Sequence, residues 1–216
     1  GYGVSVFLFN VHNKRSADCA TNKKRLIEGK RVKQFTEVTV NFDPPQLEAG
    51  MLVVDGLFGS GLNKPLAGGF AAMVKYINQS AAKIVSIDLP SGLMSEDNSY
   101  NISANIIRAD LTLTLQQKKL SMMMADNQQY LGRIKVLDIR LSPEFIQRTE
   151  SRCSILEEKD IRQLLKPRGD FAHKGSMGTA LLIAGSYGMS GASVLATRAC
   201  LRTGVGKVIT HTPKRN

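Results

Sequence analysis

The sequence predicts an α/β protein built around a parallel sheet. Short apolar runs recur along the 216 residues, helical segments separate them, and the runs at residues 51–54 and 84–87 each end in an aspartate, Asp55 or Asp88, followed by a turn with glycine or proline. Buried parallel strands read as continuous apolar runs, and alternation of strands with helices is typical of parallel sheets. Ligands of such sheets bind beyond the carboxyl ends of the strands.

The first two thirds of the chain are expected to alternate between strands and helices. Apolar or alternating runs predict strands at residues 4–9, 32–40, 51–54, 84–87, 111–115 and 134–139. A capping serine, Ser16, and a stop glycine, Gly29, delimit one helix, and apolar residues at helical spacing predict a second helix over residues 68–79. The polar residues 94–105 are expected to form a loop.

The pattern changes after about Leu141. Residues 142–154 mix polar and apolar types without a strong period and suit a connector. The following elements are a helix over residues 157–165, a strand over 179–184, a helix over 192–203 and a strand over 207–212. A piece of about 60 residues with this pattern exposes too much apolar surface to be stable by itself. We therefore expect the start of a second domain.

Composition and charge restrict the class of protein. Lys and Arg number 29 against 18 Asp and Glu, and this net charge of +11 is spread along the chain. Without tryptophan or a nucleic-acid recognition motif, a solvated basic surface that favours an anionic ligand is the better interpretation. No apolar run approaches the ~20 residues of a membrane span, and the first nine residues do not read as a signal peptide. Three widely spaced cysteines suit a reducing cytoplasm rather than disulfides or zinc.

The first candidate motif follows the strand that ends at Asp55. It reads GLFGSGLNKP over residues 56–65, and Gly59 and Gly61 allow the backbone to approach a phosphate closely. Backbone N–H groups and Lys64 would supply the positive complement. A strand-to-helix turn that merely needs glycines explains the spacing about equally well, because short glycine loops are weak evidence.

The second candidate motif is Asp88-Leu89-Pro90-Ser91-Gly92. Ser91 and Asp55 together offer hard oxygen ligands for a cation, and Asp88 is suited to accept hydrogen bonds from a ligand or to move a proton. Turn capping by aspartate and serine is the commoner explanation for such a segment alone. The pairing of the two motifs at adjacent strand ends favours a site for a phosphate-bearing small molecule.

A third glycine-rich turn, GSYGMSGA, ends at Ala192 and joins a strand to a helix. It resembles a nucleotide-binding turn but matches neither common phosphate-binding motif. A sugar or vitamin kinase would account for it but leaves residues 50–140 unexplained. We interpret His173 as a loop residue and Met122–Met124 as adaptable packing.

Longer stretches of the chain resemble a known family. The runs VVDGLFGSGLNKPLAGGFAAMVKYIN, IVSIDLPSGL, ADLTLTLQQKKLSM and YLGRIKVLDI resemble the YjeF N-terminal domain, the NAD(P)H-hydrate epimerase. The run PRGDFAHKGSMGTALLIAGSYGMSGASVLATRACLRTGVGKV resembles the start of the ADP-dependent NAD(P)H-hydrate dehydratase. The resemblance implies a three-layer αβα Rossmann-like domain over residues 1–149 and the first βαβ part of a ribokinase-like α/β domain over residues 150–216.

The resemblance further implies repair of nicotinamide nucleotides. The epimerase interconverts the R and S hydrates of NADH and NADPH, and the dehydratase removes water from the S hydrate at the expense of ADP. By resemblance, Asp55 and Ser91 are potassium ligands and Asp88 contacts the substrate. Our own hypothesis is that Asp88 also takes part in acid–base chemistry. The implied substrate contacts are Gly59, Ser60, Gly61, Leu62, Asn63, Lys64, Pro65, Asp88 and Ala192. The implied cofactors are K⁺ for the first domain and ADP with Mg²⁺ for the second.

Parts of the family pattern are missing. Its NNGGDG loop would precede Gly1, the later dehydratase motifs would follow Asn216, and Arg140 and Gln117 replace a usual glycine and proline. We therefore expect a segment truncated at both ends and incomplete for both activities. The alternative is a non-catalytic nucleotide- or partner-binding module with an epimerase-like fold. We expect a cytoplasmic protein with a small-molecule substrate and no nucleic-acid or membrane partner, and homo-oligomer formation stays open.

Overall fold

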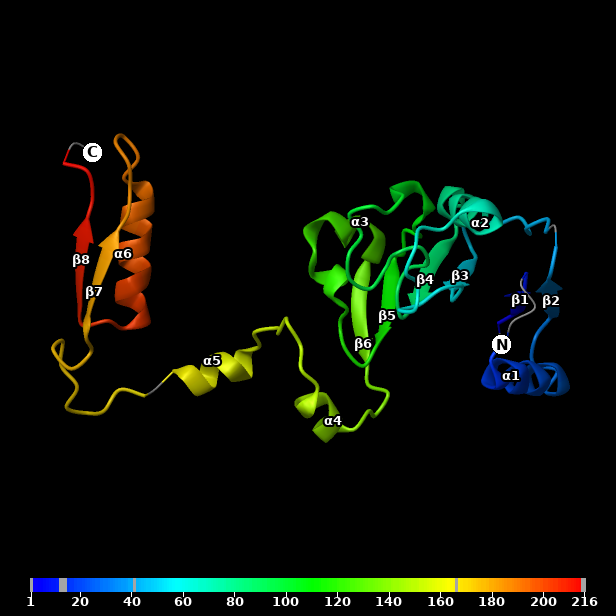
Figure 1. Ribbon diagram of the computed structural model, residues 1–216, viewed down its shortest axis with the longest axis horizontal. Coiled ribbons are helices and arrows are strands. Elements are labelled where there is room, and N and C mark those ends of the chain that lie inside the picture. The colour runs from blue at the N-terminus through cyan, green and yellow to red at the C-terminus, as the bar shows by residue number, and fades with distance from the viewer. Residues whose placement is uncertain (1, 12–14, 41, 166, 215–216) are drawn as a thin grey trace. The chain divides into compact units, whose positions relative to one another are not determined.

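The computed structural model describes residues 2–11, 15–40, 42–165 and 167–214 (Figure 1). The chain divides into two compact units, Gly1–Cys153 and Ser154–Asn216, and each is described by itself. Both units contain parallel strands connected through helices, so the predicted α/β class with parallel sheets is confirmed. The assignment of an epimerase to one unit and a dehydratase to the other stays a prediction.

A four-stranded parallel sheet forms the centre of the first unit. Its order is β3 (Leu52–Asp55), β4 (Lys83–Ile87), β5 (Leu111–Leu115) and β6 (Arg133–Leu137). Asp55 at the end of β3 pairs with Ser86 near the end of β4, and Ser86 pairs in turn with Thr112 of β5. The carboxyl ends of β3 and β4, with the two aspartate motifs, therefore lie at the same edge of the sheet.

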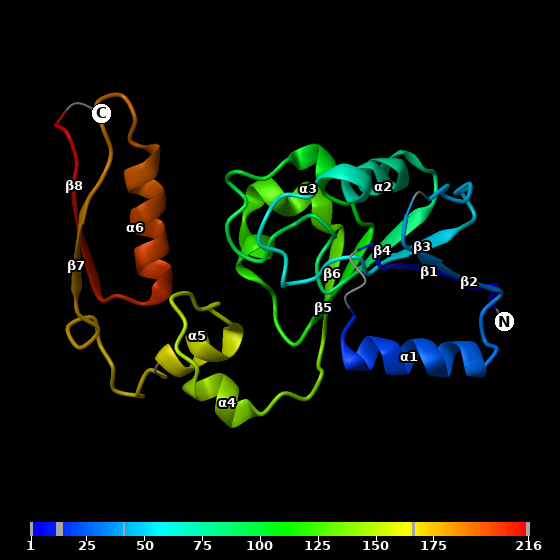
Figure 2. The same ribbon diagram turned by 45° about the vertical axis from the view of Figure 1, so that its right-hand side comes forward.

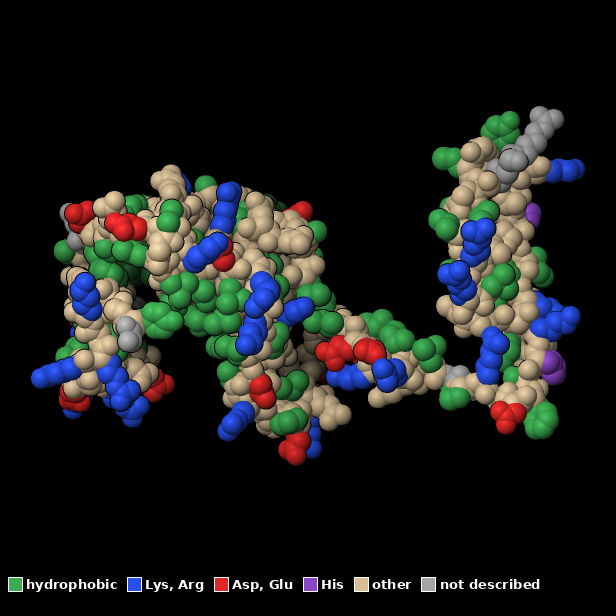
Figure 3. All heavy atoms as spheres, turned by 180° about the vertical axis from the view of Figure 1, so that it is seen from behind, with side chains coloured by type: hydrophobic (Ala, Val, Ile, Leu, Met, Phe, Trp, Pro, Cys, Tyr) green, Lys and Arg blue, Asp and Glu red, His purple; other side chains and the backbone are tan. Residues whose placement is uncertain are grey.

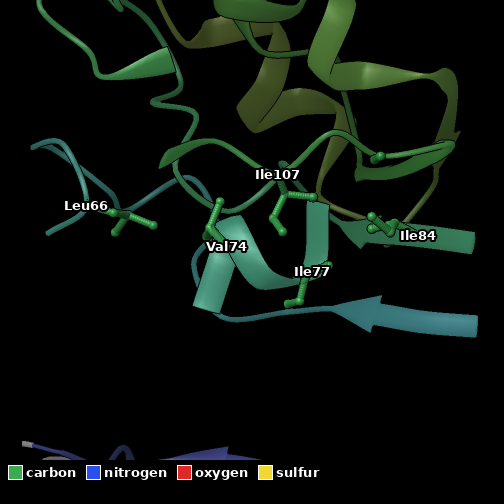
Figure 4. Close-up of a cluster of buried hydrophobic side chains, with 6 residues drawn as sticks. Leu66, Val74, Ile77, Ile84 and Ile107 are labelled. Atoms are coloured by element: carbon green, nitrogen blue, oxygen red, sulfur yellow. The ribbon is translucent and has the colours of Figure 1, made fainter. Parts of the chain in front are cut away.

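The helix α2 (Gly68–Gln79), which has the predicted bounds, covers one face of this sheet (Figure 2). Its buried residues Val74 and Ile77 pack with Ile84 of β4, as Figure 4 shows. The cluster also includes Leu66, Ile107 and Ala109. A second cluster consists of Leu89, Leu93, Ile106, Met122, Tyr130 and Leu131. The two clusters therefore include Ile84 before the second candidate motif, Leu89 within it and Leu93 directly after it.

The first residues form a separate pair of parallel strands, β1 (Ser5–Phe9) and β2 (Gln34–Val38), connected by α1 (Ala17–Glu28). The predicted cap is confirmed, because the Ser16 side chain accepts a hydrogen bond from the backbone N–H of Cys19. Gly29 ends the helix as expected. Strand β2 is shorter than the predicted run 32–40 at both ends.

The remaining short elements of this unit lie before and after β5 in the sequence. They are the 3₁₀ turns η1 (Ser103–Asn105), η2 (Leu120–Met123) and η3 (Ala125–Asn127) and the helix α3 (Gln128–Leu131). The first of these turns lies at the end of the segment predicted as a loop. After β6, the helix α4 (Pro143–Arg148) occupies part of the predicted connector. The start of α4 has a capping motif, which a search for hydrophobic periodicity does not detect. The Ser142 hydroxyl accepts a hydrogen bond from the backbone N–H of Phe145, and Pro143 occupies the first helical position.

The second unit contains α5 (Glu158–Leu164) and a parallel βαβ segment of β7 (Thr179–Ile183), α6 (Gly191–Thr203) and β8 (Lys207–His211). Gly204 ends α6 with φ of 110°, a conformation that glycine adopts at little cost. Of the helices within the described residues, none is long and apolar enough to cross a membrane. Lys and Arg side chains are scattered over the face shown in Figure 3, in agreement with the spread of basic residues along the sequence.

Gly92 is expected to be intolerant of substitution. Its φ is 99°, and an added Cβ would lie 2.1 Å from the carbonyl oxygen of Asn105. Gly92→Ala should reduce the free energy of unfolding by about 3 kcal/mol, measured by urea denaturation. Gly69→Ala is the control, because its Cβ would meet no atom within 4 Å. A Gly92→Ala protein as stable as the control would contradict this account.

Candidate functional site

The side chain of Asp55 is the most highly connected group at the carboxyl edge of the sheet. It is 2% exposed. Its Oδ2 accepts hydrogen bonds from the Ser86 hydroxyl (2.7 Å) and from the Ser91 backbone N–H (2.8 Å), and its Oδ1 accepts one from the Ser91 hydroxyl (2.5 Å). One buried carboxyl group thus joins the end of β3 to β4 and to the turn that follows β4. The structure brings together the two residues that the sequence analysis paired as cation ligands.

The glycine loop of the first motif is bound to this turn through its backbone. The N–H of Phe58 donates to the Ser91 hydroxyl (3.0 Å), and the N–H of Ser60 donates to Oδ2 of Asp88 (3.3 Å). These two contacts, on either side of Gly59, attach the glycine loop to the second motif. The loop therefore lies directly beside the Asp88 carboxyl group.

The predicted substrate contacts within residues 59–65 differ in exposure. Ser60, Gly61, Asn63 and Lys64 are exposed, so the Lys64 ammonium group is accessible to an anion from solvent. Leu62 instead packs against the first hydrophobic cluster, so its side chain anchors the loop. The Leu62 N–H also donates to the Gly59 carbonyl oxygen (3.2 Å), so both its side chain and its backbone support the loop.

Asp88 has an unusual backbone conformation and a highly connected carboxyl group. Its φ of 68° lies in the left-handed region, which costs a residue other than glycine about 1 kcal/mol. Oδ1 accepts hydrogen bonds from the Leu115 N–H (3.2 Å) and from the Lys119 ammonium group. Backbone strain at a carboxylate beside a glycine loop is typical of functional positions.

The environment of Asp88 holds its carboxyl group in the charged form. Burial is the largest single influence and by itself raises the pKa. The hydrogen bond and charge of Lys119, with the N–H groups of Leu115 and Ser60, outweigh burial and leave the pKa below its usual value. At neutral pH the group is therefore a carboxylate, which can accept a proton or a hydrogen bond.

Sequence reasoning missed Lys119. The sequence analysis treats the basic residues together as a surface spread along the chain, yet the Lys119 side chain is only 15% exposed while its neighbour Lys118 is exposed. The position of Lys119 shortly after a predicted strand was the one sequence feature that pointed to the site. The local sequence does not distinguish Lys119 from Lys118.

The other predicted positions lie in the second unit. Ala192 is exposed in the first turn of α6, and His173 is exposed in a loop, where its Nδ1 accepts a hydrogen bond from the N–H of Gly175. The interpretation of His173 as a loop residue agrees with this placement. Whether Ala192 contacts a substrate stays a prediction.

No three His, Cys, Asp or Glu side chains gather as a metal-binding group in the described part of the chain. The oxygens of Asp55 and Ser91 nevertheless lie together, and the carbonyl oxygen of Phe58 is 3.4 Å from the Ser91 hydroxyl. Hard cations prefer such oxygen donors, usually six or more of them. The donor types fit an alkali cation, and further ligands would have to complete its shell.

Comparison with known proteins gives consistent matches. Residues 1–121 match the family model described as YjeF-related protein N-terminus. A Coxiella burnetii protein named bifunctional NAD(P)H-hydrate repair enzyme Nnr is 33% identical over 171 residues, which are 79% of this chain and 35% of that protein. Proteins of the same name from Dictyoglomus turgidum and Thermofilum pendens are each 30% identical, covering 89% and 95% of this chain and 36% and 38% of their own lengths. The chain spans about a third of the length of these curated relatives.

The lowered pKa of Asp88 predicts a pH-dependent contribution to stability. Because the folded pKa lies below the unfolded one, the contribution is complete above the unfolded pKa, about 3.9, and is lost as the pH falls through the folded pKa. Asp88→Asn should therefore destabilise the protein most at neutral pH, and its difference from wild type should shrink below about pH 4. Urea unfolding between pH 7 and pH 2.5 measures this.

Asp126→Asn, at an exposed position, is the matched control for loss of one carboxyl group. A difference between Asp88→Asn and wild type that stays constant over this pH range would contradict the assignment of Asp88 as a stabilising carboxylate.

Proposed function

This chain belongs to the family of YjeF-related protein N-termini, and on that premise we propose that its first unit is an epimerase that interconverts the R and S hydrates of NADH and NADPH. The names of its relatives, which are NAD(P)H-hydrate repair enzymes, support this reaction. The observation that carries the proposal is the ionised Asp88 carboxylate beside the glycine loop. A fixed carboxylate next to a phosphate-binding loop places an acid–base group within reach of a bound nucleotide.

The exposed part of the glycine loop is proposed to bind the phosphates of the hydrate. Gly59 and Gly61 let backbone N–H groups approach a phosphate, and Lys64 adds a positive charge that no described ion pair uses. Pro65 stiffens the end of the loop before α2. Binding of the phosphates by the loop would place the hydrated nicotinamide ring near Asp88. Phosphate binding and acid–base chemistry would then use different residues at the carboxyl edge of the sheet.

Potassium is proposed to bind between Asp55 and Ser91. The Ser91 hydroxyl donates to Asp55 and accepts from Phe58, which leaves one lone pair for a cation. A cation bound there would add positive charge at the sheet edge where an anionic ligand approaches. The residues of this chain would hold it and keep the turn after β4 in place.

The dehydratase activity is proposed only for a longer protein. The second unit resembles the start of that domain, and Ala192 is its proposed substrate contact. ADP and Mg²⁺ are the proposed co-substrate and cofactor of that reaction. The alternative function, a binding module without catalysis, would use the same loop but would not need a strained, ionised aspartate.

Asp88→Asn is expected to abolish epimerisation. The amide cannot act as a base and would place a neutral group beside Lys119, so kcat should fall at least about 100-fold. The measurement starts from pure R or S NADPH hydrate and follows the appearance of the other epimer by chromatography. The protein is produced from its complete natural coding sequence. Asp126→Asn is the control. Normal interconversion by Asp88→Asn would refute the acid–base role of Asp88, whereas a wild-type protein without interconversion would favour the binding module.

Ser91→Ala is expected to raise the K⁺ concentration that gives half-maximal activity at least about tenfold, since a ligand is lost. The matched control is Ser86→Ala, because Ser86 is equally buried and also donates to Asp55 but is not a proposed ligand. Titration of activity with KCl at constant ionic strength separates the two. Equal shifts in both variants would mean that the serines only support Asp55 and would argue against the ligand role.

A further inference from the structure

We propose that Lys119 is a positioning residue for Asp88, and that it fixes one carboxyl oxygen, Oδ1, so that the other, Oδ2, is the one that meets the substrate. This inference rests on the proposed function of the same site, because the substrate is the one proposed there. It adds a residue from a third segment of the chain, the turn after β5, to the two motifs at the ends of β3 and β4.

The hydrogen bonds of the carboxylate divide its two oxygens. A carboxylate can accept about four hydrogen bonds, two at each oxygen. Oδ1 accepts two, from the Lys119 ammonium group and from the N–H of Leu115 (3.2 Å). Oδ2 accepts one, from the N–H of Ser60 (3.3 Å). Within the described residues, Oδ2 alone retains room for a further donor.

The position of Oδ2 agrees with this division. It is the oxygen next to the glycine loop, since a Cβ added at Gly59 would lie 3.4 Å from it. A ligand held by that loop would therefore meet Oδ2 first. Oδ1 points instead toward β5 and the turn that follows it, where the donors of Leu115 and Lys119 lie.

Lys119 has no donor to spare for a ligand. Its ammonium group has three N–H bonds, and they are matched by Asp88 Oδ1, the Thr114 hydroxyl (3.0 Å) and the Leu115 carbonyl oxygen (3.0 Å). Its side chain is also largely buried. Lys119 therefore acts through Asp88, in contrast to the exposed Lys64, which is free to approach a phosphate.

Loss of Lys119 would free the carboxyl group. Oδ1 would keep only the long hydrogen bond from Leu115, and rotation about the side-chain bonds would move Oδ2 away from the loop. A displacement of about 1 Å at a reacting group costs on the order of 100-fold in rate. Lys119 also lowers the pKa of Asp88 through its positive charge. The other groups around this ion pair are neutral: the N–H groups of Ser60 and Leu115 contact Asp88, and the Thr114 hydroxyl contacts Lys119.

The test compares Lys119→Met with Lys118→Met in the protein expressed in its natural reading frame. Both variants lose one positive charge from adjacent positions, but Lys118 is exposed and makes none of these contacts. One readout is kcat and KM for hydrate epimerisation. The other is the pKa of the Asp88 carboxyl group, measured by ¹³C NMR and assigned through the missing signal of Asp88→Asn. Should Lys119→Met fail to fold, Lys119→Gln replaces it.

We expect Lys119→Met to lower kcat about 100-fold with a smaller change in KM and to raise the Asp88 pKa, while Lys118→Met stays within about threefold of wild type. An unchanged kcat, or a loss of activity without movement of the Asp88 pKa, would overturn the positioning role. An inactive wild-type protein would refute the proposed function instead. In that case the carboxyl titration alone decides whether Lys119 holds Asp88.

Discussion

The structure of the candidate site depends on one constraint, the burial of the Asp55 carboxyl group at the end of β3. A buried polar group without partners costs about 1–3 kcal/mol for each unsatisfied hydrogen bond, so its neighbours must supply donors. Ser86 and Ser91 do so from β4 and from the turn that follows it. The need to satisfy Asp55 thereby fixes the turn, and the turn fixes the loop through the contact between Phe58 and Ser91.

This arrangement separates support from chemistry. Asp55 and Ser91 are buried and have most of their hydrogen bonds within the protein. Asp88, three residues before Ser91, lies between the glycine loop and β5 and keeps one oxygen partly free. Two aspartates at equivalent strand ends therefore have different roles, because one faces the interior of the turn and the other faces the loop that is proposed to bind a ligand.

Much of the fold follows from local patterns. The strands and the helix α2 lie close to their predicted bounds because burial on a parallel sheet requires continuous apolar runs and helical spacing. The short helix α4 was missed because six residues are too few for a period, although Ser142 and Pro143 mark its start. The proximity of Asp55 and Ser91 was expected, because the carboxyl ends of adjacent parallel strands lie at the same edge of a sheet. The structure shows that the two side chains are joined by a direct hydrogen bond.

The sequence by itself determined the class of fold, the two motifs and the edge of the sheet where they meet, because these depend on residue type and spacing along the chain. The tertiary structure alone decided the roles of the lysines. Lys118 and Lys119 are identical in type and adjacent, and only the path of the turn after β5, where Gln116 has φ of 61°, determines which one reaches Asp88. The direction of a side chain depends on backbone geometry and on distant partners, and a local pattern carries neither.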